Sequence, residues 1–152
     1  MKFMNVNGLT PLALGAEGER FARQQFEAMG YVVRPPLEKK TGDLAVIDKS
    51  TGEVIKVEVK TSRNGSDGRW QFCVTRRAVG RNKTDCQHAD VVLLQAVNAK
   101  TGLVTAYIVP AKEMNGQAIL RISSAGSALS KWARFMSDYQ IMEVNHEWQK
   151  VA

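Results

Sequence analysis

Three residues in the first half of the chain, Asp43, Glu58 and Lys60, have the charges and the spacing that metal-dependent hydrolysis requires. Two segments, 43–48 and 53–60, alternate polar and β-branched residues and predict a hairpin across a turn at 49–52. A four-residue loop of this kind places Asp43 opposite Glu58, with Cβ atoms about 4.5–5.5 Å apart. Facing carboxylates repel each other, and a divalent cation such as Mg²⁺ between them relieves the repulsion.

Lys60 lies two residues beyond Glu58, so the alternation of side chains puts both on one face of the strand. There the ammonium group could orient an attacking water or neutralise charge that develops on a phosphate. The same Lys-x-Glu-x-Lys pattern is typical of a half-exposed strand without any catalytic role, and the strand alone favours that interpretation. Asp43 at the expected partner position favours the catalytic one.

A helix is predicted over residues 16–29, with an apolar stripe at Ala22, Phe26 and Met29. Glu19 falls on this stripe, whereas Glu17 points almost in the opposite direction. A carboxylate directed inward requires a partner, which a metal ion or Lys60 would provide. Alternatively, Glu19 is an acidic residue near the helix start that interacts with the positive end of the helix dipole.

The length of 152 residues, with 44% hydrophobic and 24% charged residues, is that of one domain, which we assign to 1–152. The formal net charge is +6, and the segment 56–83 carries all of this excess through eight basic and two acidic residues. Such a local positive charge is suited to a polyanion such as nucleic acid, although a solvated basic surface would look the same.

The chain has no apolar run of about 20 residues and no long apolar leader, so we expect neither a membrane protein nor an exported one. The two cysteines lack CxxC spacing, which favours free thiols in the cytoplasm.

Further strands are expected at 31–34, 69–74, 90–96, 103–109 and 118–122, and further helices at 76–89 and 127–137. This order of elements predicts an α/β fold in which helices flank both faces of a mixed central β-sheet.

Taken in order, the helical Glu19, the pair Gly42-Asp43 and the strand segment Glu58-Val59-Lys60 resemble the PD-(D/E)XK nuclease superfamily. Restriction endonucleases, Holliday-junction resolvases and some intron homing endonucleases belong to this superfamily. The resemblance covers residues 15–75, and Gly42 stands where the motif has proline. It implies a restriction-endonuclease-like core in which Asp43, Glu58, the Val59 carbonyl and Glu19 bind Mg²⁺, or Mn²⁺ in its place, and Lys60 is the catalytic lysine.

The implied activity is metal-dependent hydrolysis of DNA by an endonuclease, without an organic cofactor. We expect a homodimer, because one site cuts one strand. Recognition of branched DNA, as by a resolvase, and sequence-specific cutting, as by a homing or restriction enzyme, both remain open. A catalytically inactive nucleic-acid-binding module is the alternative from another class. The expected DNA contacts are Arg63, Arg69, Gln71, Arg76, Arg77, Arg81 and Lys83, of which Gln71 resembles a glutamine near the site in some branches.

Overall fold

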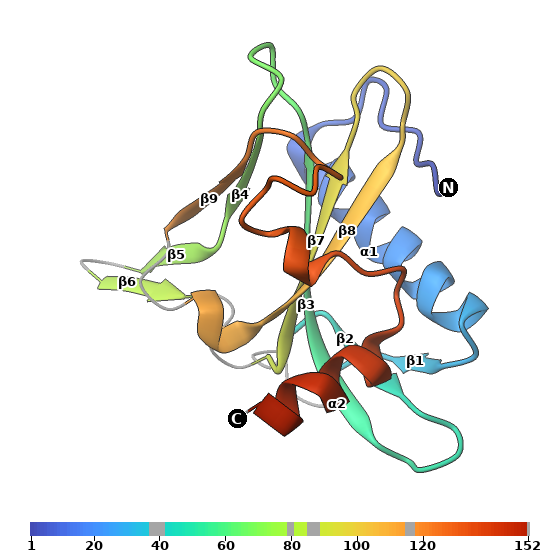
Figure 1. The fold of residues 1–152 in the computed structure, drawn as a ribbon. Helices are drawn as coiled ribbons and strands as arrows, with labels where there is room; N and C mark the ends of the chain where they lie inside the picture. The colour runs from blue at the N-terminus through green and yellow to red at the C-terminus, as the bar shows by residue number, and fades with distance from the viewer. Residues whose placement is uncertain (37–41, 79–80, 85–88, 115–117, 152) are drawn as a thin grey trace.

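The computed structural model describes residues 1–36, 42–78, 81–84, 89–114 and 118–151. Its centre is a five-stranded sheet in the order β1-β2-β3-β7-β8 (Figure 1). β3 and β7 are parallel and the other neighbours antiparallel, so the sheet is mixed, as predicted. The strands are β1 (Val32–Arg34), β2 (Leu44–Ile47), β3 (Val54–Arg63), β7 (Val91–Val97) and β8 (Val104–Pro110).

Helix α1 (Pro11–Ala28) covers one face of this sheet (Figure 1). It begins at Pro11 rather than at residue 16, because the Thr10 hydroxyl caps it by accepting a bond from the Ala13 N–H at 3.1 Å. Phe21 and Phe26 pack from the helix into a core that also contains the inward residues of β3. None of the helices in the described part of the chain is both long and apolar enough to cross a bilayer.

The opposite face is covered by a small second sheet of β4 (Trp70–Cys73) and β9 (Ile119–Ile122). Trp70 and Phe72 pack against Leu94 and Tyr107 of the central sheet in a second buried cluster. Two 3-10 turns, η1 (Ala111–Met114) and η2 (Ala133–Phe135), complete this side. Helix α2 (Ile141–Val151) contributes Ile141, Met142 and Val144 to the core on the α1 side. Trp148 of α2 contacts both clusters.

The predicted helix at 76–89 is wrong. Its described residues form an antiparallel hairpin of β5 (Thr75–Ala78) and β6 (Arg81–Thr84), while 79–80 and 85–88 lie outside the described residues. Two features of the sequence oppose a helix here. Gly80 lowers helix propensity, and Arg77 and Arg81 would stand four residues apart on one helix face, where like charges repel.

The predicted helix at 127–137 is also wrong, since only the short turn η2 forms there. The hydroxyls of Ser127 and Ser130 accept bonds from the N–H groups of Leu129 and Trp132, both at 3.2 Å. Such local bonds compete with the helical pattern. The C-terminal helix is instead α2, whose apolar residues recur at Ile141, Val144 and Trp148.

A buried polar network fixes α1 on the sheet. Gln95, in the middle of β7, is fully buried and donates to the Gly18 carbonyl at 2.9 Å and to the Thr61 hydroxyl at 3.0 Å. The Tyr139 hydroxyl donates to the side-chain carbonyl oxygen of Gln95 at 2.7 Å. Helix and strand approach so closely that a Cβ atom on Gly18 would lie 1.9 Å from Thr61 Oγ1. The residue after Gly18 in the helix is Glu19.

We expect Gly18→Ala to lower the free energy of unfolding by about 1–3 kcal/mol, the usual cost of overpacking. Gly15→Ala is the matched control in the same helix, because its added Cβ would meet nothing within 4 Å. This control should be neutral or should stabilise by about 0.5–1 kcal/mol. Urea denaturation measures both, and equal effects of the two substitutions would contradict the close packing at Gly18.

Candidate active site

The pairing of β2 with β3 brings Asp43 beside the β3 segment that carries Glu58. The register runs from Ile47 opposite Val54 to Leu44 opposite Val57 and ends there. Asp43 donates its N–H to the Val57 carbonyl, so it does not continue the ladder as the partner of Glu58. The turn closes as expected, with the Asp48 N–H donating to the Glu53 carbonyl at 2.9 Å. The hairpin is therefore confirmed, with its register over 44–47 and 54–57, whereas the expected pair of Asp43 with Glu58 is not part of the ladder.

Asp43 is bonded to the β3 backbone on both sides of Glu58. Its N–H donates to the Val57 carbonyl at 2.7 Å, and its Oδ2 accepts from the Val59 N–H at 2.8 Å. Gly42 makes this approach possible, because its φ of 115° is in the left-handed region and an added Cβ would lie 2.7 Å from the Val57 carbonyl oxygen. Proline, whose φ is fixed near about −65°, cannot adopt this backbone, so glycine at this point of the motif has a local structural reason.

Asp43 and Glu58 lie at the point where β3 extends beyond the end of β2. β2 begins at Leu44, opposite Val57, whereas β3 continues to Arg63; among the described strands only β7 pairs with β3 beyond Glu58. The N–H and C=O of one strand residue point to the same side. Since the Val59 N–H bonds Asp43, the Val59 carbonyl is directed to the same edge of β3.

Glu58 and Lys60 are partners on one face of β3, as the alternation predicted. The Lys60 Nζ lies 3.3 Å from Glu58 Oε1, and the side chains are 21% and 14% exposed, respectively. Both also make interactions beyond this pair. On the other face of the strand, Val57 and Val59 are buried in the core against α1. The Glu58–Lys60 pair is thus partly shielded from water, and the opposite face of its strand is held in place by packing in the core.

Glu19 is exposed overall and does not lie on the buried stripe, contrary to the prediction, but its carboxyl is partly desolvated where it is hydrogen-bonded to Asp43. Burial raises the pKa of the Glu19 carboxyl, and the charge of Asp43 and a hydrogen bond to it raise this pKa further, while Arg23 acts in the opposite direction. Glu17 instead forms an ion pair with Arg20, whose hydrogen bond lowers the Glu17 pKa. Of the two acids, Glu19 is therefore the one directed to the site.

The residues at this edge match the chemistry of a Mg²⁺ site in part. Within the described ranges, no group of three or more His, Cys, Asp or Glu side chains is arranged to hold a metal ion. Mg²⁺, however, is usually bound by one or two carboxylates, with waters and substrate phosphates completing its shell. Asp43 and the Val59 carbonyl lie at the same edge of β3, Glu58 is the strand residue before Val59, and Glu19 contacts Asp43. These are oxygen groups of the kind that Mg²⁺ binds.

The residues predicted to contact DNA have different surroundings. The Arg63 guanidinium donates to the carbonyls of Val6 and Leu9, so it ties the N-terminal segment to the end of β3 instead of being displayed to solvent. Arg69 and Gln71 are exposed, and Gln71 lies on the side of β4 opposite to the buried Trp70 and Phe72. Gln71 therefore faces away from the central sheet that carries Glu58. The other four, Arg76, Arg77, Arg81 and Lys83, belong to β5 and β6, and their side chains lie outside the described part of the structure.

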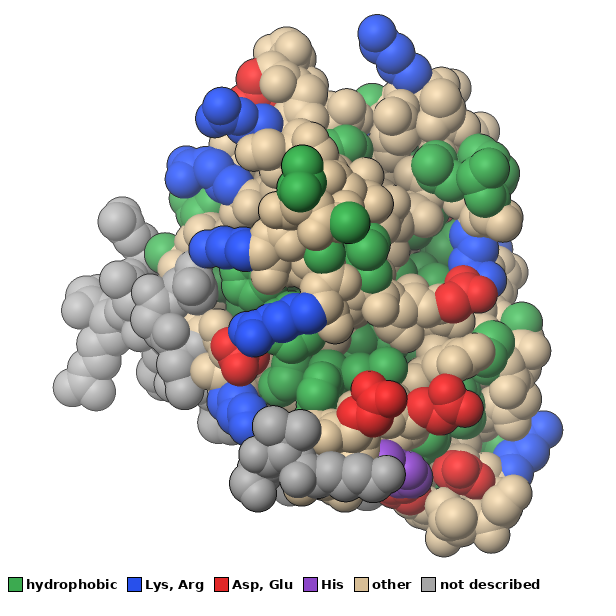
Figure 2. All heavy atoms as spheres, viewed as in Figure 1, with side chains coloured by type: hydrophobic (Ala, Val, Ile, Leu, Met, Phe, Trp, Pro, Cys, Tyr) green, Lys and Arg blue, Asp and Glu red, His purple; other side chains and the backbone are tan. Residues whose placement is uncertain are grey.

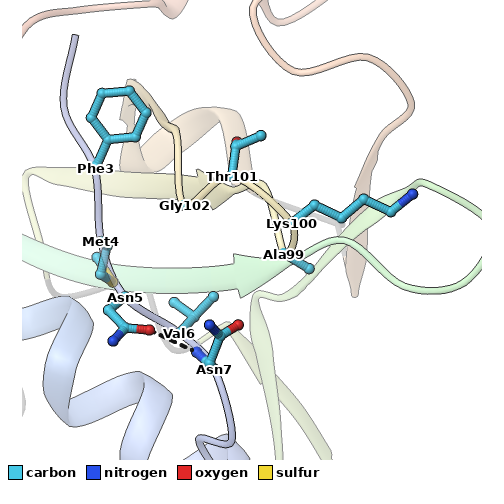
Figure 3. A pocket seen from close by; sticks show the side chains of 9 residues that line it. All are labelled: Phe3, Met4, Asn5, Val6, Asn7, Ala99, Lys100, Thr101 and Gly102. Carbon is cyan, nitrogen blue, oxygen red and sulfur yellow. Dashed lines mark hydrogen bonds between the residues drawn. The ribbon is translucent and has the colours of Figure 1, made fainter.

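A hollow of about 240 Å³ between the N-terminal segment and the β7–β8 turn does not contribute to this site. Figure 3 shows that the side chains of Phe3, Asn5 and Lys100 point in different directions from its rim. Asn5 is engaged by the N–H of Asn7 at 3.2 Å (Figure 3). The hollow thus lacks the convergent polar groups that a catalytic site requires.

Sequence reasoning missed Gln95 and Gly18, which hold α1 beside the acids. A signal for Gln95 was present, because it is the one polar residue in the run VVLLQAV that forms β7. A buried amide requires hydrogen-bond partners, and those partners lie on other elements.

Comparisons with family models and with curated proteins found no match to this chain. Among solved structures, that of a bacterial homing endonuclease is similar, with a TM-score of 0.65 and 16% sequence identity, over 94% of this chain and 99% of that chain. Similarity at this level of identity concerns the fold. The mixed α/β, restriction-endonuclease-like architecture predicted from the sequence is confirmed.

We expect Glu19→Gln to raise the melting temperature at pH 7 in metal-free buffer. A raised pKa means that folding favours the neutral carboxyl; the resulting stability is present below the ordinary glutamate pKa and is lost as pH rises through the raised value. At pH 7 the wild type carries the unfavourable charge and the glutamine variant does not. The gain should not exceed about 2–4 °C, and it should disappear below about pH 4.

Glu17→Gln is the control two residues away in the same helix. Its carboxyl has a lowered pKa, so its ionised form stabilises the fold above the ordinary pKa. Removing that charge should leave the melting temperature at pH 7 unchanged or slightly lower. A fall for Glu19→Gln at pH 7 would contradict the proximity of Glu19 and Asp43.

Proposed function

We propose that this protein is a DNA endonuclease that hydrolyses phosphodiester bonds with Mg²⁺, and that Asp43, Glu58 and Lys60 are its catalytic residues. One observation carries the proposal: Asp43 is bonded to the β3 backbone on both sides of Glu58, beside the pair formed by Glu58 and Lys60. Two carboxylates close together at a strand edge would repel each other and lower the stability of the fold. A bound cation between them would relieve this repulsion.

In this proposal Asp43, Glu58 and the Val59 carbonyl hold Mg²⁺, with Glu19 at the border of the shell. Bound Mg²⁺ supplies Lewis-acid chemistry at a phosphoryl oxygen and lowers the pKa of a bound water. The Lys60 ammonium, 3.3 Å from Glu58, orients the attacking water and stabilises the negative charge that develops on the phosphate. The pKa of Glu19 is raised by burial and by Asp43, so its carboxyl holds a proton more readily than an ordinary glutamate.

The similar structure of a homing endonuclease supports sequence-specific cutting of duplex DNA as the first choice of substrate. Each site cuts one strand, so we further propose that two copies of the chain act together on a duplex. Branched DNA is the second substrate to test, because the sequence pattern is shared with resolvases.

We expect the wild type to nick plasmid DNA in Mg²⁺ or Mn²⁺ and to be inactive in EDTA. Lys60→Ala, Asp43→Asn and Glu58→Gln should each lower the single-turnover cleavage rate by about 10²–10³-fold, the usual effect of removing one electrostatic group from a site. Gel analysis of plasmid, linear duplex and four-way-junction DNA gives the rates and the preferred substrate.

Lys56→Ala is the matched control, since Lys56 lies on the same strand face two residues before Glu58. It removes the same charge and should keep the wild-type rate within a few-fold. If wild type and Lys60→Ala cut equally well, or if neither cuts any of the three DNAs, the catalytic proposal fails and a binding module without activity remains.

Mg²⁺ should also raise the melting temperature of the wild type without DNA, by about 2–4 °C for each kcal/mol of binding free energy. The double variant Asp43→Asn/Glu58→Gln should lose this increment. Glu143→Gln/Glu147→Gln removes two acids of α2 and should retain it. Calorimetric scans in Mg²⁺ and in EDTA, at neutral pH, measure the increment separately from activity. An equal increment in both double variants would assign the metal to other residues.

A further inference from the structure

A second surface with the chemistry of phosphate binding lies over β9. Its centre is a hollow of about 380 Å³ lined by Arg121, Lys131 and the serines Ser123, Ser124, Ser127 and Ser130. Hydroxyl, guanidinium and ammonium groups are the side chains that commonly bond to the phosphates of nucleic acid. None of these residues belongs to the site at Asp43 and Glu58.

The charge of this surface is of one sign. From Met114 to Ser137 the chain contains Arg121, Lys131 and Arg134 and no acidic residue. Arg121 and Lys131 are exposed, and neither forms an ion pair with a carboxylate in the described part of the chain, whereas Arg134 lies 3.7 Å from Glu113. Figure 2 shows basic side chains gathered along the flank formed by β4, β9 and the segment after β9.

The loop 123–130, which carries the serines, is anchored to the central sheet. The buried Tyr107 of β8 accepts a hydrogen bond from the Gly126 N–H at 3.0 Å. Ser127 and Ser130 use their oxygens as acceptors for backbone N–H groups, which leaves each hydroxyl hydrogen available to a ligand. The Lys131 ammonium lies 5.1 Å from the centre of the Trp132 ring. The donors are thus held on an anchored loop, which reduces the entropy cost of binding.

Trp132 also lines the hollow. Its side chain is 6% exposed, and its indole N–H has no hydrogen-bond acceptor among the described residues. A buried donor without an acceptor is unfavourable, because it has lost its bonds to water. A residue that lines the hollow therefore has a hydrogen-bonding group that the described part of the chain leaves unused.

The surface is continuous with residues already expected to contact DNA. Arg121 lies opposite Gln71 in the β4–β9 pair, and both are exposed. Arg69 precedes Gln71 by two residues and is also exposed. The outer side of the small sheet therefore leads from these two residues to the hollow.

We propose that the hollow beside Arg121 and Lys131 binds backbone phosphates of DNA at a distance from the cutting site. This inference rests on the proposed function, which supplies the DNA. Because phosphate contacts carry no base information, the surface contributes affinity and orientation, not recognition of sequence. The shared chemistry is a phosphate oxygen, so free phosphate is the other source that the test must distinguish.

The test is the salt dependence of duplex binding, measured by fluorescence anisotropy in EDTA so that metal-dependent cutting does not interfere. Arg121→Ala/Lys131→Ala should weaken binding at low salt and make the slope of log K against log salt shallower by about 2, since each neutralised phosphate contributes about 0.9 to that slope. Lys49→Ala/Lys100→Ala removes the same charge from two exposed turns and should leave the slope nearly unchanged. Ser123→Ala/Ser124→Ala should weaken binding without a change in slope.

Each outcome supports or overturns the inference. An unchanged slope for Arg121→Ala/Lys131→Ala, with wild-type binding intact, overturns the phosphate contact and leaves the proposed endonuclease standing. Absence of DNA binding and of cutting in the wild type itself overturns the proposed function and this inference with it. In a second arm, inorganic phosphate is titrated by calorimetry; if it binds the wild type but not the double variant, while both bind duplex equally, the hollow is a site for free phosphate and not for DNA.

Discussion

The edge of β3 at which Asp43 lies beside Glu58 exists because β3 is longer than β2. Because β2 begins at Leu44 and β3 continues to Arg63, the backbone of β3 beyond Glu58 meets no strand on that side among those described. Asp43 takes the place of the next strand residue, with its main chain bonded to Val57 and its side chain to Val59. A longer β2 would satisfy the same backbone groups by sheet pairing. The chain instead satisfies them with a carboxylate, and so presents an acid where an ordinary hairpin would present a strand.

The second requirement is that α1 approach this edge closely enough for Glu19 to reach Asp43. Gly18 allows the approach, and Gln95 makes it specific, since its amide uses both its donor and its acceptor side within the core. A buried polar network stabilises one arrangement only when all its members are bonded, as they are here at Thr61 and Tyr139. An apolar residue at position 95 would pack as well against other helix positions. The network therefore selects the helix position, and with it the location of Glu19.

Sequence reasoning succeeded where the physics is local. The loop of four residues fixed the pairing of 44–47 with 54–57, because side-chain alternation and loop length leave little freedom in a hairpin. The loop length did not predict that Asp43 leaves the ladder and bonds Val57 and Val59 instead. Sequence reasoning failed where local signals compete: the segment 127–137 was expected to be a helix, but its serines bond local N–H groups in turns, and the described part of the segment 76–89 was expected to be a helix but pairs as strands. The contact of Glu19 with Asp43 depends on the packing of α1 across the sheet, which periodicity alone does not define. Gln95 was visible only as an exception in an apolar strand.

In the proposed endonuclease, an acidic site and a polyanionic substrate would repel each other, and basic residues elsewhere on the surface would offset this repulsion. Lys60 offsets Glu58 within the site itself, at 3.3 Å. Further attraction must come from residues outside the acidic edge, because a cation that paired directly with Asp43 would compete with the metal. Arg69 beside β4, Arg121 of β9 and Lys131 of the following segment meet this condition: they are exposed, and they lie on or beside the small sheet and not on the central sheet that carries Glu58. Their attraction weakens over about 10 Å at 0.1 M salt, so it acts on the phosphates they touch and leaves the carboxylates free to bind a cation.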